Sequence, residues 1–155
     1  MPGTNKAVFV SGVFDLFHRG HVELFRRAAE LGDQLFVGVN SDEMVAKYKR
    51  RPVYSEDDRL CIVKAMACVT DAVIYDAFDL KPMVERFRPA IMVHGDDWPR
   101  ASYLEQICMT EDDLLRYGVE LVFLPYWRGT STTSILDVVG ARSLEAAHAA
   151  ALAVA

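Results

Sequence analysis

The sequence predicts an α/β protein, a Rossmann-like three-layer sandwich with a parallel sheet of about five strands. Short β-rich apolar runs alternate with segments of helical periodicity along the 155 residues, an order that builds right-handed β–α–β units. The length suits a single domain with a sizeable core. We expect residues 1–140 to form this domain and residues 141–155 to add an alanine-rich C-terminal helix or tail to it.

Each element follows from the spacing of its apolar residues. Strand runs are short and rich in β-branched and aromatic residues, whereas helical patterns repeat apolar residues every three or four positions. In chain order we expect strand 7–10 (AVFV), helix 22–31 (VELFRRAAEL), strand 34–39 (QLFVGV), helix 43–49 (EMVAKYK), strand 72–75 (AVIY), helix 80–87 (LKPMVERF), strand 90–93 (AIMV) and strand 120–124 (ELVFL).

Composition and charge exclude several kinds of partner. The net charge of −5 leaves no electrostatic footprint for nucleic acid or for an anionic membrane. No secretory signal is apparent, and no apolar run approaches the roughly 20 residues of a spanning helix. Cys61, Cys68 and Cys108 are odd in number and show no metal-ligand spacing. We expect a soluble, cytoplasmic chain with reduced thiols and no protein-held metal.

The most informative segment runs from Ser11 to His21 and reads SGVFDLFHRGH. A strand that ends in small residues and releases into a helix leaves unpaired N–H groups, which bind anionic phosphates. His18 and His21 are three positions apart and can face one phosphate, and Gly20 leaves room for a nucleotide beside the backbone. The pattern predicts a phosphate-transfer site, although a lone histidine at a helix start is more often a cap or a core residue.

This segment resembles the G-x-F-D-x-x-H-x-G-H signature of the cytidylyltransferase-like nucleotidyltransferases, with the signature residues in register. The resemblance implies that residues 1–140 are a nucleotidyltransferase domain. It also implies that His18 and His21 are catalytic and stabilise the α-phosphate in the transition state. The nucleotide-binding residues that it implies here are Gly12, Val13, Phe14, Asp15 and Gly20.

A second block, residues 128–135 (RGTSTTSI), follows the last strand and precedes a helical pattern. Ser131 and Thr132 stand where a helix takes its N-cap, and hydroxyls and free amides there would hold a triphosphate. Gly129 and the Ser-Thr-Thr run resemble the second signature of the family, R-T-E-G-I-S-T-T. The resemblance implies that Gly129, Ser131 and Thr132 bind the nucleotide, whereas an ordinary helix cap is the alternative explanation.

A third segment, Gly95, Asp96, Asp97 and Trp98, follows the strand at 90–93. Ligands of parallel sheets bind beyond the carboxyl ends of the strands, so this loop can meet the other two motifs at one site. The string resembles the G-D-D-W loop of glycerol-3-phosphate cytidylyltransferases, which implies that these four residues bind the nucleoside half of the nucleotide. An acidic turn with a buried tryptophan is the alternative.

A basic run at residues 47–51 (KYKRR) predicts either a loop that closes over phosphates like a lid or a solvated surface. Lys49 stands where related sequences place a lysine of this loop, and Arg59 where they place an arginine that opens the next helix. The resemblance implies that Lys49 is catalytic and that Arg59 binds the α- and β-phosphates. Lys47 is a candidate for binding the acceptor.

Together these parts imply a cytidylyltransferase. An oxygen of a small phosphate or phosphonate acceptor attacks the α-phosphorus of CTP in line, CMP is transferred and pyrophosphate leaves. The motifs offer no carboxylate cage for a metal, so Mg²⁺ would be carried mainly by the CTP phosphates. The resemblance also implies a homodimer.

Two departures from the glycerol-3-phosphate enzymes bear on the acceptor. Tyr126, Trp127 and Arg128 replace the leading R-T-E of the second signature, and the chain between Trp98 and Val119 is longer. A cation in place of an acidic residue favours a more highly charged acceptor, such as a carboxylated phosphonate. We therefore expect these three residues to bind the acceptor. The alternative is that Arg128 points to solvent or binds the γ-phosphate.

Two other functions stay open at this point. One is an adenylyltransferase of the same superfamily acting on a sugar phosphate such as a heptose phosphate, against which the G-D-D-W loop and the Ser-Thr-Thr block argue. The other is a nucleotide-binding sensor without turnover, against which the intact pair His18 and His21 argues.

Overall fold

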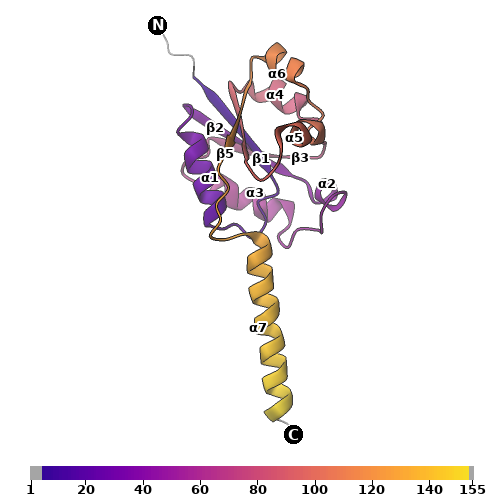
Figure 1. The fold of residues 1–155 in the computed structure, drawn as a ribbon. Helices are drawn as coiled ribbons and strands as arrows, with labels where there is room; N and C mark the ends of the chain where they lie inside the picture. The colour runs from indigo at the N-terminus through magenta and orange to yellow at the C-terminus, as the bar shows by residue number, and fades with distance from the viewer. Residues whose placement is uncertain (1–4, 154–155) are drawn as a thin grey trace.

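Five parallel strands form one sheet with helices on both of its faces (Figure 1). The computed structural model describes residues 5–153. The strands are β1 (Ala7–Gly12), β2 (Gln34–Asn40), β3 (Asp71–Tyr75), β4 (Ile91–Gly95) and β5 (Glu120–Leu124). Their order across the sheet is β3-β2-β1-β4-β5. The predicted Rossmann-like α/β fold is confirmed.

The central strand is β1, which pairs with β2 along its whole length and with β4 from Val8 to Val10. A strand with a neighbour on each edge and a layer of side chains on each face has no water-facing side, which explains its unbroken apolar run. The strand order reverses between β1 and β4. Ligands of open α/β sheets bind at the carboxyl ends of the strands beside such a reversal.

Seven helices connect or extend the strands within residues 5–153. They are α1 (Arg19–Ala29), α2 (Asp42–Ala46), α3 (Glu56–Lys64), α4 (Lys81–Phe87), α5 (Arg100–Gln106), α6 (Glu111–Tyr117) and α7 (Thr132–Ala153). α1 begins earlier than expected because His18 caps it. α2 ends earlier than expected, at Ala46, so the basic run at 47–51 lies almost entirely in the loop that leads to α3.

The helices α5 and α6 occupy the segment between Trp98 and Val119, for which the sequence patterns predicted no helix. Both ends of α6 are fixed locally. Thr110 and Asp113 form a reciprocal capping box at its start, and Gly118 adopts the left-handed conformation at its end, with φ of 66°.

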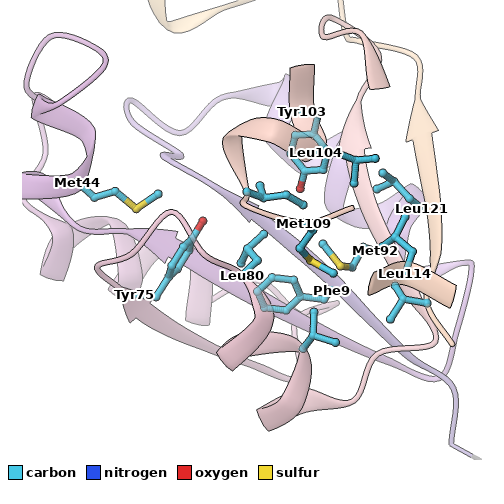
Figure 2. Close-up of a cluster of buried hydrophobic side chains, with 13 residues drawn as sticks. Phe9, Met44, Tyr75, Leu80, Met92, Tyr103, Leu104, Met109, Leu114 and Leu121 are labelled. Carbon is cyan, nitrogen blue, oxygen red and sulfur yellow. The ribbon is translucent and has the colours of Figure 1, made fainter. Parts of the chain in front are cut away.

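Side chains of β1 alternate between two hydrophobic clusters, one on each face of the sheet. Phe9 packs with Met92 in the cluster that also holds side chains of α4, α5 and α6 (Figure 2). Val8 and Val10 belong to the other cluster, with Phe25 of α1. Each fully buried side chain of this size contributes about 1.5–3 kcal/mol. Burial on both faces therefore fixes the carboxyl end of β1, where the first motif begins.

The last helix, α7, projects from the body of the molecule (Figure 1). Its 22 residues run without a break through position 140, so the boundary expected there falls inside one helix. Val138, Val139 and Leu144 are exposed on its surface. The C-terminal helix expected for residues 141–155 is present up to Ala153, and residues 154–155 lie outside the described part. Among the described residues, no helix is both long and apolar enough to cross a membrane.

Candidate active site

A cavity of about 750 Å³ opens at the carboxyl ends of the strands, and the three sequence motifs meet around it. The Thr132 hydroxyl donates a 2.9 Å hydrogen bond to the carbonyl oxygen of Asp15, which joins positions 117 residues apart. The expected site residues that line the cavity are Gly12, Val13, Phe14, Asp15, His18, Gly20, His21, Lys49, Gly95, Asp97, Trp98, Tyr126, Trp127, Arg128, Ser131 and Thr132. Those that do not line it are Lys47, Arg59, Asp96 and Gly129.

The loop between β1 and α1 is held in a strained conformation. Phe14 and Leu16 adopt left-handed backbone angles, with φ of 55° and 46°. For residues that carry a side chain this conformation costs about 1–2 kcal/mol each. The Phe14 ring lies so close to Gly12 that a Cβ on that glycine would stand 2.9 Å from the ring Cζ. The same ring meets the His21 imidazole edge-on, at 5.6 Å between centroids, so the strained turn supports His21.

The two histidines cap the helix that they begin. His18 Nδ1 accepts a 3.0 Å hydrogen bond from the Gly20 N–H, and His21 Nδ1 accepts one of 3.2 Å from the His18 N–H. An Nδ1 that accepts a hydrogen bond carries no proton, so in the neutral ring the proton is on Nε2. The capping box therefore fixes the tautomer of both rings. Each ring keeps its Nε2–H as the remaining donor.

Both histidines are held neutral. Burial lowers the pKa of His21 to about 3, with a further lowering from the charge of His18 and an opposing effect from Asp15. Burial also lowers the pKa of His18. The ring centroids lie 3.9 Å apart, and two imidazolium charges at that distance would repel each other. At neutral pH the pair therefore offers two neutral N–H donors.

The Asp15 carboxylate accepts hydrogen bonds from backbone groups of its own turn and of the loop after α2. Its Oδ1 accepts hydrogen bonds from the N–H groups of Leu16 and Tyr54, both at 3.0 Å, and its Oδ2 accepts one of 2.9 Å from the Val53 N–H. Arg50 approaches the same oxygen at 3.9 Å. Asp15 lines the cavity as expected, yet its oxygens bind the loop after α2 and so position the basic run over the site.

Arg59 lies beneath the cavity, in contrast to the expected contact with phosphates. Its side chain is 0% exposed. Nη1 donates to the Val13 carbonyl at 2.6 Å, Nη2 donates to Asp42 Oδ1 at 2.7 Å and to the Asn40 carbonyl at 2.9 Å, and Nε donates to the Tyr54 carbonyl at 3.2 Å. These partners take four of the five N–H donors of the guanidinium, so Arg59 ties the first motif, the end of β2 and the loop after α2 together.

Of the other three expected residues outside the cavity wall, Asp96 and Gly129 support the site and Lys47 lies on the surface. Lys47 is exposed at the C-cap of α2. Asp96 Oδ1 accepts a 2.7 Å hydrogen bond from the Tyr126 N–H and so joins the loops after β4 and β5. A Cβ on Gly129 would stand 2.7 Å from Nε1 of Trp127, so this glycine leaves room for the indole.

The start of α7 closes the cavity from the side of β5. Ser131 Oγ accepts a 3.0 Å hydrogen bond from the Ser134 N–H, as a helix N-cap does. The Thr132 hydroxyl is bonded to Asp15 as described above. The N-terminus of a helix of this length carries partial positive charge and free N–H groups, which bind anions. Lys49 and Arg128 add full positive charges to the cavity lining.

A stacked pair links the first motif to the last. The Arg19 guanidinium lies over the Trp127 ring, 4.6 Å from its centroid.

The sequence pattern of the cytidylyltransferase-like family matches residues 9–137, which span the motifs around the cavity. The chain belongs to the cytidylyltransferase-like family.

Several proteins similar to this cytidylyltransferase-like chain carry the name bifunctional protein HldE. Those of Campylobacter concisus and Geobacter metallireducens are each 35% identical to it over 136 residues, or 86% of the chain. The protein of Helicobacter pylori is 32% identical over the same length. The chain spans 27% of each of these relatives, about a quarter of their length.

Solved structures agree with the fold. The lipopolysaccharide core biosynthesis protein from Thermoplasma volcanium superimposes with a TM-score of 0.69 at 26% identity, covering 79% of this chain and 98% of that one. A protein of unknown function from Archaeoglobus fulgidus gives a TM-score of 0.64 at 19% identity, over 81% of this chain and 93% of its own. The family assignment rests on the match over residues 9–137 and on the relatives above 30% identity. The narrower resemblance to glycerol-3-phosphate cytidylyltransferases is not supported by these relatives.

One wall of the cavity in this cytidylyltransferase-like chain carries uncharged polar side chains that were not among the expected site residues. The neutral wall, as we call it, consists of Ser11, Asn40, Tyr48, Tyr75, Tyr103 and Gln106. Asn40 donates to the Tyr48 hydroxyl and accepts from the Tyr75 hydroxyl, both at 3.3 Å. Asn40 and Tyr75 are the last residues of β2 and β3, and that strand-end position was the available signal in the sequence.

Burial keeps the aromatic groups of this region uncharged. It raises the pKa of Tyr75 and raises the pKa of Tyr103 to about 12, against a smaller lowering by the Ser11 hydroxyl. His94 stacks on Tyr103 with centroids 4.1 Å apart, and burial lowers its pKa, while Asp97 opposes that change. Within the described residues, no group of three His, Cys, Asp or Glu side chains could hold a metal ion.

Proposed function

We propose that the chain transfers a nucleoside monophosphate from a nucleoside triphosphate to the phosphate group of a small sugar phosphate, with release of pyrophosphate. The observation that carries this proposal is the pair His18 and His21. Both imidazole rings have a fixed tautomer, with the proton on Nε2, and both line a cavity that also contains a helix N-terminus. Two neutral donors held in place suit the stabilisation of charge on a transferring phosphoryl group.

The reaction needs no covalent intermediate with the protein. An oxygen of the acceptor phosphate forms a bond to the α-phosphorus while the bond from that phosphorus to the bridging oxygen breaks, and pyrophosphate takes the electron pair. His18 and His21 would donate to the non-bridging α-oxygens. Lys49, whose Nζ lies 5.8 Å from the centroid of the Tyr48 ring, would neutralise the α-phosphate from the side of β2, and the start of α7 would hold the β- and γ-phosphates.

The expected Mg²⁺ fits this site only when the phosphates of the nucleotide hold it. The Asp15 oxygens, which are the nearest buried carboxylate oxygens in the first motif, already accept backbone hydrogen bonds. Mg²⁺ usually binds substrate phosphates and keeps several of its waters. It would supply charge neutralisation of the leaving pyrophosphate, while the orientation of the α-phosphate would come from His18 and His21.

ATP is the donor that we favour. The relatives at 32–35% identity are HldE proteins, and the structural neighbour at 26% identity is named for lipopolysaccharide core biosynthesis. These names support the adenylyltransferase alternative, with a sugar phosphate as acceptor, over transfer of CMP. CTP is the second candidate because of the Gly95 to Trp98 loop. Asp96 of that loop holds Tyr126 instead of lining the cavity, which weakens the case.

The test combines each of the four nucleoside triphosphates with hexose and heptose 1-phosphates, glycerol phosphate and a carboxylated phosphonate, and follows pyrophosphate release. We expect ATP with a sugar 1-phosphate to exceed every other pair by at least tenfold in kcat/KM, which needs only about 1.4 kcal/mol of discrimination. Preference for CTP with glycerol phosphate would establish the second candidate. Binding of nucleotide without turnover of any acceptor would identify a sensor.

A further inference from the structure

We infer, on the basis of the proposed function, that the neutral wall is the acceptor subsite and that it selects a polyhydroxylated, otherwise uncharged acceptor. Ser11, Asn40, Tyr48, Tyr75, Tyr103 and Gln106 would contact the sugar while the acceptor phosphate faces the histidine pair.

The strand order places Asn40, Tyr75 and Ser11 on the side of the sheet that a second substrate requires, and Tyr103 and Gln106 reach the same cavity from α5, which follows β4. Asn40 and Tyr75 end β2 and β3, at one edge of the sheet, and Ser11 lies near the end of the central β1. The start of α7 and Arg128 follow β5, at the opposite edge. The histidine loop lies between them. In an in-line displacement the attacking and leaving oxygens stand on opposite sides of the phosphorus. Pyrophosphate held at the start of α7 leaves the β2 side for the acceptor.

The hydrogen-bonding groups of the wall match hydroxyls. Asn40 and the hydroxyls of Tyr48 and Tyr75 form a chain whose two bonds are both 3.3 Å long, beyond the usual 2.7–3.2 Å range for a well-made hydrogen bond. Asn40 uses both of its amide N–H groups, because Nδ2 also donates to Met44 Sδ at 3.5 Å, but the Tyr48 hydroxyl can still donate and the Tyr75 hydroxyl can still accept. A sugar hydroxyl both donates and accepts, so it can join the chain at either end.

Because the six residues of the neutral wall carry no charge, they favour an acceptor that is uncharged apart from its phosphate group. All six are uncharged at neutral pH, because Tyr75 and Tyr103 stay protonated. Lys49 Nζ lies 5.8 Å from the centroid of the Tyr48 ring, but the proposed reaction uses this cation for the α-phosphate, so a carboxylate placed against the wall would be desolvated without a free cation and would bind weakly. The expected carboxylated phosphonate therefore fits this wall poorly. Arg128, which was expected to read it, lies on the side of β5.

The subsite is tested with two variants and a matched control. Gln106→Ala and Tyr103→Phe each remove hydrogen-bonding atoms from the cavity, whereas Glu105→Ala changes an exposed residue of the same helix α5 that does not line it. We expect both cavity variants to raise the KM for a hexose or heptose 1-phosphate by roughly 5- to 20-fold, the range of one lost hydrogen bond. The KM for ATP should stay within about twofold in all three.

A binding measurement separates this inference from the proposed function. Calorimetry with the same sugar 1-phosphates, in the presence of a non-hydrolysable ATP analogue, reports acceptor affinity without turnover. Weaker sugar binding in Gln106→Ala, with no turnover in any assay, supports the subsite and overturns the proposed function. Turnover of a sugar phosphate with acceptor KM values equal to those of Glu105→Ala overturns the subsite alone. So does a rise confined to the KM for ATP.

Discussion

At the scale of single residues, each histidine of the pair uses one ring nitrogen for the backbone and leaves the other for a ligand. His21 Nδ1 holds the His18 N–H, and His18 Nδ1 holds the Gly20 N–H. Capping and catalysis are therefore properties of different atoms on the same ring. Substitutions that keep the cap, with and without the second donor, can measure them separately.

His21→Asn and His21→Gln make this separation. The Asn oxygen stands near the position of Nδ1 and can still accept from His18, but it has no donor where Nε2 was. We expect near-normal stability and a kcat lowered by roughly 10²–10³, as for a lost donor to a developing negative charge. A Gln at this N3 position can accept from the His18 N–H through its Oε1, as Gln does in a capping box, and its amide N–H can reach the Nε2 position, so we expect similar stability and a kcat above that of His21→Asn. Turnover assays and urea unfolding of both variants measure the two effects, and equal kcat values would refute the assignment.

The buried His21 also makes stability depend on pH. Its pKa is about 3 in the folded chain and 6.5 as a free group. Between these values the unfolded chain binds a proton that the folded chain excludes, so the free energy of unfolding decreases as the pH falls from about 6.5 towards 3. The change from this group is on the order of a few kcal/mol. The free energy of unfolding, measured with urea at several pH values across this range, should change less steeply with pH in His21→Asn than in the wild type. An equal dependence on pH in the two proteins would contradict the burial argument.

The identities of the central residues could be predicted from the sequence because a strand end, a glycine and two histidines occur at short, fixed spacing. The roles of Asp15 and Arg59 could not. Each is satisfied by backbone groups of loops far along the chain, such as the contact of Arg59 with Val13, 46 positions away. The spacing of residues along the chain does not predict which distant carbonyl groups a buried guanidinium will bind.

At the scale of elements, two buried side chains couple the first motif to the loop after α2. Asp15 accepts from the backbone of Val53 and Tyr54, and Arg59 donates to Val13 and Tyr54. The basic run at 47–51 is thus anchored at its C-terminal side, next to the cavity. Its lysines and arginines can move only within the limits of this anchor.

Arg59→Leu should release that anchor. The change leaves the Asp42 carboxylate and three carbonyls without their partner, and breaking a buried ion pair in this way costs about 3–5 kcal/mol. We expect a large fall in the free energy of unfolding, measured by urea denaturation. Arg51→Leu is the control, since Arg51 is exposed in the same region. If Arg59→Leu instead keeps the stability of the wild type and raises the KM for ATP, Arg59 binds the phosphates of the nucleotide, as the sequence predicted.

The elements missed from the sequence, α5 and α6, are short and have weak apolar periodicity. The signal for α6 was at its ends, in the pair Thr110 and Asp113 and in Gly118. The early end of α2 at Ala46 had no comparable signal, because the helical pattern continues to residue 49. Where the tertiary contacts of the following loop are strong, they override such a pattern.

At the scale of the whole molecule, the parallel sheet could be predicted from the sequence, whereas the surface used by a second copy of the chain could not. Five buried runs in alternation with helical segments leave few arrangements of parallel strands. The projecting α7 is different, because Val138, Val139 and Leu144 are exposed on a helix that extends away from the body of the molecule. The homodimer expected from the family stays a prediction.

Removal of residues 144–155 tests what α7 does. Within the described residues, the contacts of the site with α7 involve its first turn, so the shortened chain should keep its melting temperature and turnover at low protein concentration. If the predicted homodimer uses the distal part of α7, sedimentation velocity will show a dimer for the full chain and a monomer for the shortened one. Identical sedimentation of the two would place any dimer contact elsewhere.

The hydrogen bond from Thr132 to the Asp15 carbonyl sets the moment in synthesis at which the site can exist. While the chain leaves the ribosome, β1, β2 and β3 are available early, but the second edge of β1 has no partner until β4 emerges. At about 5–20 residues per second this edge stays open for several seconds. An open apolar strand edge is a template for wrong pairing. The nascent chain is therefore most vulnerable to aggregation before Ile91 appears, and it can bind nucleotide only once its last helix has begun.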